Sequence, residues 1–116
     1  MSLKYPSQWA PATAMVAFNG CPNDPHKPTS VPIYQTATFI QPSASESAAY
    51  DYTRSGNPTR TALETLVAGL EGAHAAFAFS TGMAALNCMT RLLESGDEIL
   101  CNADIYGIAP SIDSID

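Results

Sequence analysis

The sequence predicts an α/β fold in which one β-α-β crossover of a parallel or mixed sheet follows an extended N-terminal arm. Three observations support this class. Seven of the nine prolines lie within residues 1–42. After residue 57, two segments carry apolar residues at helical spacing, and a short apolar run typical of a buried strand follows each of them.

Residues 1–57 are predicted to form the arm, because proline fixes the backbone and removes a donor and no apolar stripe of helical period accompanies it. Within the arm, residues 33–40 are β-branched and aromatic and are suited to lying along another surface. Residues 42–47 predict an exposed loop. An arm without its own core needs a surface to pack on, and another subunit would supply one.

The first helix is predicted to begin with Asn57 as N-cap and Pro58 at the first helical position, and to end at Gly72. Residues 75–80 then predict a buried strand. The buried face of the helix is expected to follow the i, i+3, i+4, i+7 spacing of Leu63, Leu66, Val67 and Leu70.

A second helix is predicted from Gly82 to Glu94, closed by Ser95 and Gly96. Residues 98–102 predict the next strand and complete the crossover. The apolar residues that this helix is expected to bury are Ala85, Leu86, Met89, Leu92 and Leu93.

The composition excludes several classes of partner. Five Lys+Arg against eleven Asp+Glu give a net charge of −6, which argues against binding to nucleic acid or to an anionic membrane surface. The uncharged run at residues 72–90 is interrupted by polar residues and does not predict a membrane span. Three cysteines without a C-x-x-C pair predict no metal site and favour a reducing, cytoplasmic setting.

The turn at residues 80–83 is the first candidate for chemistry. A strand that runs directly into a helix places the first helical N–H groups at the carboxyl end of the sheet, and Gly82 lets an anion approach the backbone closely. This predicts a phosphate site. The alternative is an ordinary Ser/Thr cap on a core helix.

Two further candidates flank this turn in the sequence. Tyr52 and Arg54, two residues apart in an extended stretch, point the same way, and a phenol beside a guanidinium suits a phosphate. Tyr106 follows the second predicted strand, where an aromatic ring can stack on a flat ligand. The alternatives are a solvated arginine with a packed tyrosine, and a tyrosine at the rim of the fold.

Four segments, in this order, resemble the Cys/Met-metabolism enzymes that depend on pyridoxal 5′-phosphate. They are SVPIYQTATF (30–39), YTRSGNPTR (52–60), FSTGMAAL (79–86) and GDEILCNADIYG (96–107). These enzymes are the fold-type-I transsulfuration enzymes, which include cystathionine β-lyase and its γ-lyase and γ-synthase relatives. YDYTRSGNPTR with VPIYQTATF resembles the cystathionine β-lyases most closely. The resemblance therefore implies that residues 58–107 are the first part of a cofactor-binding α/β domain.

The resemblance also implies roles for individual residues. Tyr52 and Arg54 resemble the pair that reaches the cofactor phosphate of a neighbouring subunit, which implies a homo-oligomer. Gly82 and Met83 match the backbone amides that cradle the phosphate. Tyr106 matches the aromatic residue that stacks on the pyridine ring and lies near the reacting amino acid, so it is the catalytic candidate. Residues 108–116 match nothing in the family pattern and are predicted to be a divergent tail.

In full-length members, the lysine that forms a Schiff base with the cofactor and the aspartate beside its ring nitrogen lie beyond position 116. Lys4 and Lys27 stand in the arm without an apolar pocket. The chain is therefore expected to be the N-terminal portion of a lyase that cleaves cystathionine to homocysteine, pyruvate and ammonia, and to be inactive alone. The alternatives are a γ-lyase, γ-synthase, methionine γ-lyase or O-acetylhomoserine sulfhydrylase, a non-catalytic interaction fragment, or an unrelated phosphate-binding domain.

Overall fold

Asn57 and Pro58 begin the longest helix in the described part of the chain, as predicted. The computed structural model describes residues 9–18 and 23–101, and its central helix α2 spans Pro58–Leu70. The Asn57 side chain accepts a hydrogen bond from the Thr59 N–H at 2.9 Å. This bond satisfies one of the N–H groups that a helix leaves free at its first turn, which is why the helix begins here.

The predicted end of α2 is also confirmed. Gly72 has a φ of +62°, a left-handed conformation that glycine adopts without strain. Its N–H donates to the Gly69 carbonyl at 3.4 Å, and the Ala73 N–H donates to the Ala68 carbonyl at 2.9 Å. These two bonds form a Schellman motif, which satisfies carbonyls at the end of the helix.

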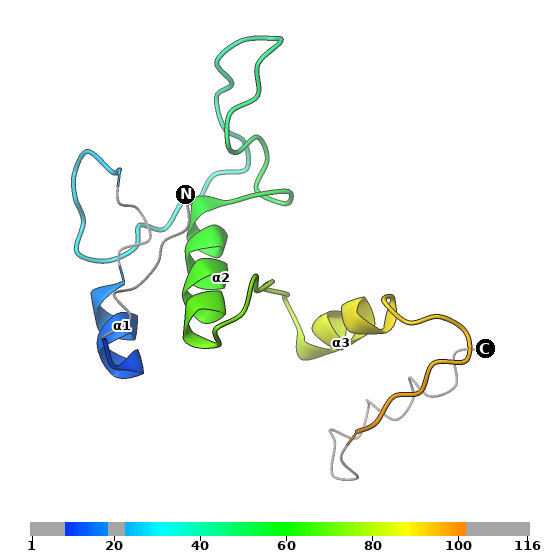
Figure 1. Ribbon diagram of the computed structural model, residues 1–116. Helices are drawn as coiled ribbons and strands as arrows, with labels where there is room; N and C mark the ends of the chain where they lie inside the picture. The colour runs from blue at the N-terminus through cyan, green and yellow to red at the C-terminus, as the bar shows by residue number, and fades with distance from the viewer. Residues whose placement is uncertain (1–8, 19–22, 102–116) are drawn as a thin grey trace. The chain divides into compact units, whose positions relative to one another are not determined.

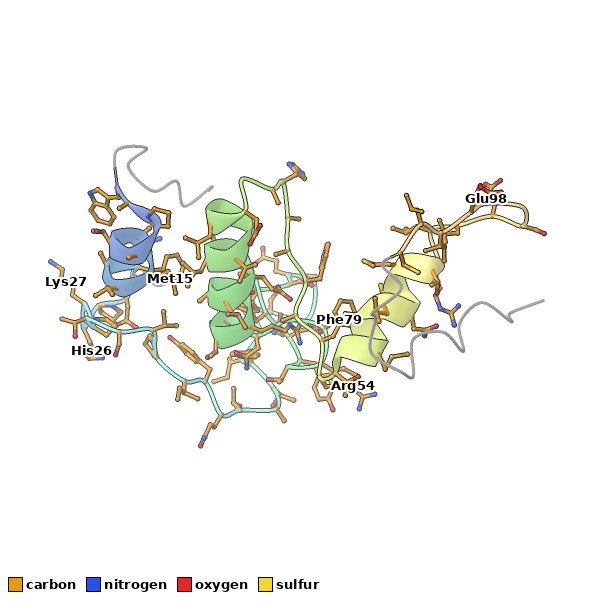
Figure 2. The ribbon with its side chains drawn as sticks, turned by 90° about the horizontal axis from the view of Figure 1, so that it is seen from below. Met15, His26, Lys27, Arg54, Phe79 and Glu98 are labelled. Carbon is orange, nitrogen blue, oxygen red and sulfur yellow. The ribbon has the colours of Figure 1, made fainter. Side chains whose placement is uncertain are left out.

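The prediction that the first half of the chain is without a helix is wrong at one place. Helix α1 spans Pro11–Ala17, and it lies beside α2 in Figure 1. Proline occupies its first turn, where the missing N–H costs nothing, and alanine and methionine then favour the helix. Ala14 is buried, whereas Met15, labelled in Figure 2, is more than half exposed.

The residues predicted to form the buried face of α2 are not the ones that are buried. Ala62 is the buried residue of this helix, at 3% exposure, whereas Leu63 and Val67 are 51% and 39% exposed. Helix α1 contacts α2. A seven-residue helix offers too little surface to cover a whole leucine stripe, so only the small residue is fully enclosed.

Helix α3 spans Gly82–Thr90 and begins where predicted, with Thr81 as its N-cap. The prediction that it continues to Glu94 is wrong. The N–H groups of Leu92 and Leu93 donate to carbonyls three residues earlier rather than four, so the helix tightens into a turn after Thr90. The predicted burial is also wrong, since Met89, Leu92 and Leu93 are exposed.

Within the ranges 9–18 and 23–101, neither predicted strand pairs with another strand. One antiparallel bridge, between Thr38 and Tyr52, is the β-pairing recorded there. The apolar residues at 75–80, which predicted a buried strand, are not buried, and Phe77 is 77% exposed. A parallel sheet needs paired strands, so the sheet stays a prediction.

The chain divides into two units, Met1–Ala78 and Phe79–Asp116. The first unit contains α1 and α2, and the second contains α3 (Figure 1). The predicted boundary between arm and α/β domain at residues 57 and 58 stays a prediction. No helix in the described ranges is long and apolar enough to cross a membrane.

Candidate phosphate-binding site

Tyr52 and Arg54 lie side by side on a tight turn rather than in the extended stretch that the sequence predicted. The Arg54 Cζ atom is 5.7 Å from the centre of the Tyr52 ring, within the range of a cation–π contact. The N–H groups of Ser55 and Gly56 both donate to the Tyr52 carbonyl at 3.0 Å, which closes the turn. Both side chains are exposed, and that of Arg54 extends away from α2 (Figure 2).

The turn is attached to the segment at residues 30–39 by backbone hydrogen bonds. Thr53 N–H donates to the Ala37 carbonyl at 2.9 Å, and Phe39 N–H donates to the Asp51 carbonyl at 2.9 Å. The Thr53 hydroxyl also donates to the Thr36 carbonyl. Two motifs that the sequence presented as separate segments are therefore one structural unit.

Side chains from the start of α2 extend this attachment. The Thr59 hydroxyl donates to the Pro32 carbonyl at 3.0 Å and accepts from the Tyr34 N–H at 2.9 Å. The buried Asn57 amide donates at 3.1 Å both to the Tyr34 carbonyl and to the Thr53 hydroxyl. Sequence reasoning identified Asn57 as a cap but did not predict these tethers.

Arg60 is the residue that the sequence analysis missed. Its guanidinium donates to the carbonyls of Thr53, Arg54 and Ser55, at 3.2, 3.4 and 2.9 Å. Its Nε lies 3.7 Å from a carboxylate oxygen of Glu64. The i, i+4 spacing of Arg60 and Glu64 is the one sequence signal that could have indicated it.

Asp51 is the acidic residue that is hydrogen-bonded within the turn. Its carboxylate accepts from the Ser55 hydroxyl at 2.7 Å and from the Tyr52 N–H at 2.6 Å. These two bonds, the first being the larger cause, favour the ionised form and lower the pKa of Asp51.

We expect the turn to be ordered at neutral pH and to loosen in acid. The pKa of Asp51 is lower in the folded chain than in the unfolded chain. The ionised carboxylate therefore stabilises the turn fully above the unfolded-state pKa, and this stabilisation is lost below about pH 4, as the pH falls through the folded-state pKa. The amide chemical shifts of Tyr52 and Ser55, followed from pH 7 to pH 2, measure this loss. Asp51→Asn should abolish the transition, and an unchanged transition in that variant would contradict the role of Asp51.

The second unit holds the other candidate, the N-terminus of α3. The Thr81 hydroxyl accepts from the Ala84 N–H at 3.1 Å, so Thr81 is a cap, as the alternative interpretation of this turn predicted. This cap does not use the N–H groups of Gly82 and Met83, and no described residue accepts a hydrogen bond from either. Two free amides at the positive end of a helix suit an anion.

The space at Gly82 tests whether a phosphate fits. A Cβ placed on Gly82 would meet no atom within 4 Å, so no packing inside the described part of the chain explains glycine at this position. The open space admits a ligand against the backbone, and the free amides are donors that match phosphate oxygens. Tyr106, the predicted ring-stacking residue, lies outside the described residues.

Comparison with known proteins identifies the family. The family model described as Cys/Met metabolism PLP-dependent enzyme matches residues 12–112. The chain belongs to this family. The match begins inside the predicted arm and runs past residue 108, where the divergent tail was predicted to start.

Individual family members agree with this assignment. A chloroplastic cystathionine beta-lyase of Mimosa pudica is 61% identical over 84 residues, which cover 72% of the chain and 18% of that enzyme. A cystathionine gamma-lyase of Bacillus subtilis is 51% identical over 78 residues, covering 67% of the chain and 21% of that enzyme. The chain thus spans about a fifth of the length of these family members.

A solved structure gives the same result for the fold. The crystal structure of metB from Corynebacterium glutamicum matches with a TM-score of 0.70 and 43% sequence identity, over 80% of the chain and 25% of that structure. The fold of this family member is therefore the architecture to which the described elements belong. The family resemblance drawn from the four sequence segments is confirmed.

Proposed function

We propose that the chain supplies the phosphate-binding part of a carbon–sulfur lyase that cleaves cystathionine to homocysteine, pyruvate and ammonia. The observation that carries the proposal is the Tyr52–Arg54 pair, held side by side and exposed on a turn that α2 anchors. A guanidinium presents paired donors to phosphate oxygens, and among the described residues none accepts a hydrogen bond from the Arg54 guanidinium.

Three groups of this chain act on the cofactor in this proposal. Arg54 and Tyr52 bind the phosphate of the cofactor in a neighbouring subunit, so the working form is a homo-oligomer. The amides of Gly82 and Met83 bind the phosphate within their own subunit, and Tyr106 covers the pyridine ring. Pyridoxal 5′-phosphate itself supplies the electron sink for breaking the carbon–sulfur bond.

The substrate subtype and the location are parts of the same proposal. The β-lyase assignment is supported by the 61% identity to the Mimosa pudica enzyme. A γ-lyase is the nearest alternative, supported by 51% identity to the Bacillus subtilis enzyme. We propose a cytoplasmic location on the basis of the cysteine pattern, although the Mimosa pudica family member is described as chloroplastic.

Non-covalent binding of the phosphate group tests this proposal. Pyridoxamine 5′-phosphate is the suitable probe because, unlike the aldehyde, it cannot react with Lys4 or Lys27. We expect its ³¹P resonance to shift and broaden on addition of the chain, with weak affinity, and pyridoxamine without the phosphate not to compete. Arg54→Ala should weaken binding by about tenfold, since a charge-assisted hydrogen bond is lost.

A second measurement tests catalysis. With pyridoxal 5′-phosphate and cystathionine, the chain alone should release no pyruvate and should retain no absorption band after desalting. Pyruvate release together with a retained band would contradict the expectation that the chain is inactive alone. Equal binding of the probes with and without phosphate would contradict the proposed phosphate site.

A non-catalytic interaction module is the second candidate function. The exposed apolar side chains Val16, Ile40, Leu92 and Leu100 favour it, because each is more than four-fifths exposed and offers surface to another subunit. Under this candidate the chain co-purifies with a full-length family member even when the phosphate-binding residues are substituted. Loss of co-purification in Arg54→Ala would favour the first proposal.

A further inference from the structure

Arg60 has a position that the stability of its own helix does not explain. It stands in the first turn of α2, where the helix dipole disfavours a positive charge. Its partner Glu64 follows four residues later, and this order of charges is the less favourable one for an i, i+4 pair. With the two side chains 34% and 23% exposed, the ion pair itself contributes little.

The hydrogen bonds of Arg60 do explain its position. Its guanidinium donates hydrogen bonds to the three successive carbonyls of Thr53, Arg54 and Ser55. These are the carbonyls of the turn that displays Tyr52 and Arg54. A turn with three of its carbonyls bonded to one helix residue has few ways to move, so the directions of its side chains are fixed with it.

Glu64 holds the guanidinium from the other side. Its Oε1 lies 3.7 Å from the Arg60 Nε and also accepts the Ala78 N–H at 2.9 Å. The Ala78 bond fixes the carboxylate, and the carboxylate in turn orients the guanidinium toward the turn. The contacts form a continuous chain within the first unit, from Ala78 through Glu64 and Arg60 to the turn.

We infer that Arg60 is a positioning residue for the Tyr52–Arg54 phosphate site, and that Glu64 orients it. The inference rests on the proposed function, because it assigns Arg60 a task at the same site. Arg60 acts through the backbone and does not contact the phosphate. By ordering the turn before the ligand arrives, it removes an ordering cost that binding would otherwise carry.

Substitutions in the full 116-residue chain test this inference. Arg60→Ala should raise the amide exchange rates of Ser55 and Gly56 by about tenfold, since their bonds to the Tyr52 carbonyl open more often. It should also weaken binding of pyridoxamine 5′-phosphate by about threefold, measured by ³¹P titration. A denaturant melt of each variant ensures that affinity is compared between folded chains.

Three further variants separate positioning from charge. Arg60→Lys retains the charge but cannot reach three carbonyls as a planar fork does, so it should behave like Arg60→Ala. Glu64→Gln can still accept from Ala78 but loses the attraction to Arg60, and it should give a smaller effect of the same sign. Arg91→Ala removes one positive charge from the second unit and should change neither readout.

The outcomes distinguish this inference from the proposed function. Wild-type behaviour of Arg60→Lys in both readouts would overturn the inference, because charge alone would then suffice. Arg60→Ala with unchanged affinity, while Arg54→Ala weakens binding, would also overturn it and leave the proposed function standing. If Arg54→Ala does not weaken binding, the phosphate role of the turn fails, and the inference fails with it even where exchange shows that Arg60 orders the turn.

Discussion

Asn57→Ala is expected to destabilise α2 and its attached segment by about 2 kcal/mol. Asn57 is 6% exposed, and its side chain makes three hydrogen bonds. The substitution removes the cap on Thr59 and leaves the Tyr34 carbonyl without its amide partner in a part-buried site. We expect amide exchange in α2 to accelerate by about thirtyfold, which is the same free energy expressed as a rate.

Asn57→Asp separates the two tasks of this residue. Aspartate retains the acceptor for the Thr59 N–H and is favoured at a helix N-terminus, but it cannot donate to the Tyr34 carbonyl or the Thr53 hydroxyl. An intermediate loss is therefore expected. If the aspartate variant matches wild type, the tethers contribute nothing, and if the alanine variant matches wild type, the cap contributes nothing either.

Three helix boundaries, namely both ends of α2 and the start of α3, could be predicted from local sequence because local chemistry decides them. Asn57 and Pro58 start α2, Gly72 follows its end, and Thr81 with Gly82 starts α3. Each signal acts within one turn of the chain. A cap needs only its own neighbours, and for that reason the prediction did not depend on the rest of the fold.

Burial could not be predicted in the same way, because it depends on what lies opposite. Leu63 and Val67 are four residues apart on α2, so their side chains lie on the same face of the helix and indicate an apolar face. Spacing does not say whether a strand or another helix covers that face, and here the small Ala62 is the buried residue. The same reason applies to Phe77, whose apolar run predicts a strand only if partner strands exist.

The candidate site shows the same division between local and long-range information. The sequence predicted that Tyr52 and Arg54 lie together, but in an extended stretch, and the turn that produces their contact could not be predicted from their spacing. Arg60 was missed because its guanidinium donates hydrogen bonds to three backbone carbonyls, and a sequence does not show in which direction carbonyls point. Positioning residues of this kind become visible only when the backbone is known.

Gly82→Ala is expected to weaken phosphate binding at α3 by about tenfold without destabilising the helix. A Cβ at this position meets no protein atom within 4 Å, and alanine is the better helix former. The added methyl group instead occupies the space through which a phosphate oxygen approaches the Gly82 and Met83 amides. Titration with pyridoxamine 5′-phosphate measures the affinity, and circular dichroism measures the helix.

Gly96→Ala is the matched control, since its Cβ also meets nothing within 4 Å and it lies in the same unit. Gly96 differs in having a φ of +101°, where any side chain is strained, so alanine should disturb the turn at residues 94–97 and leave phosphate affinity unchanged. The two variants should thus show opposite patterns. Wild-type affinity in Gly82→Ala would mean that the free amides of α3 do not bind the phosphate, and the glycine would then need another explanation.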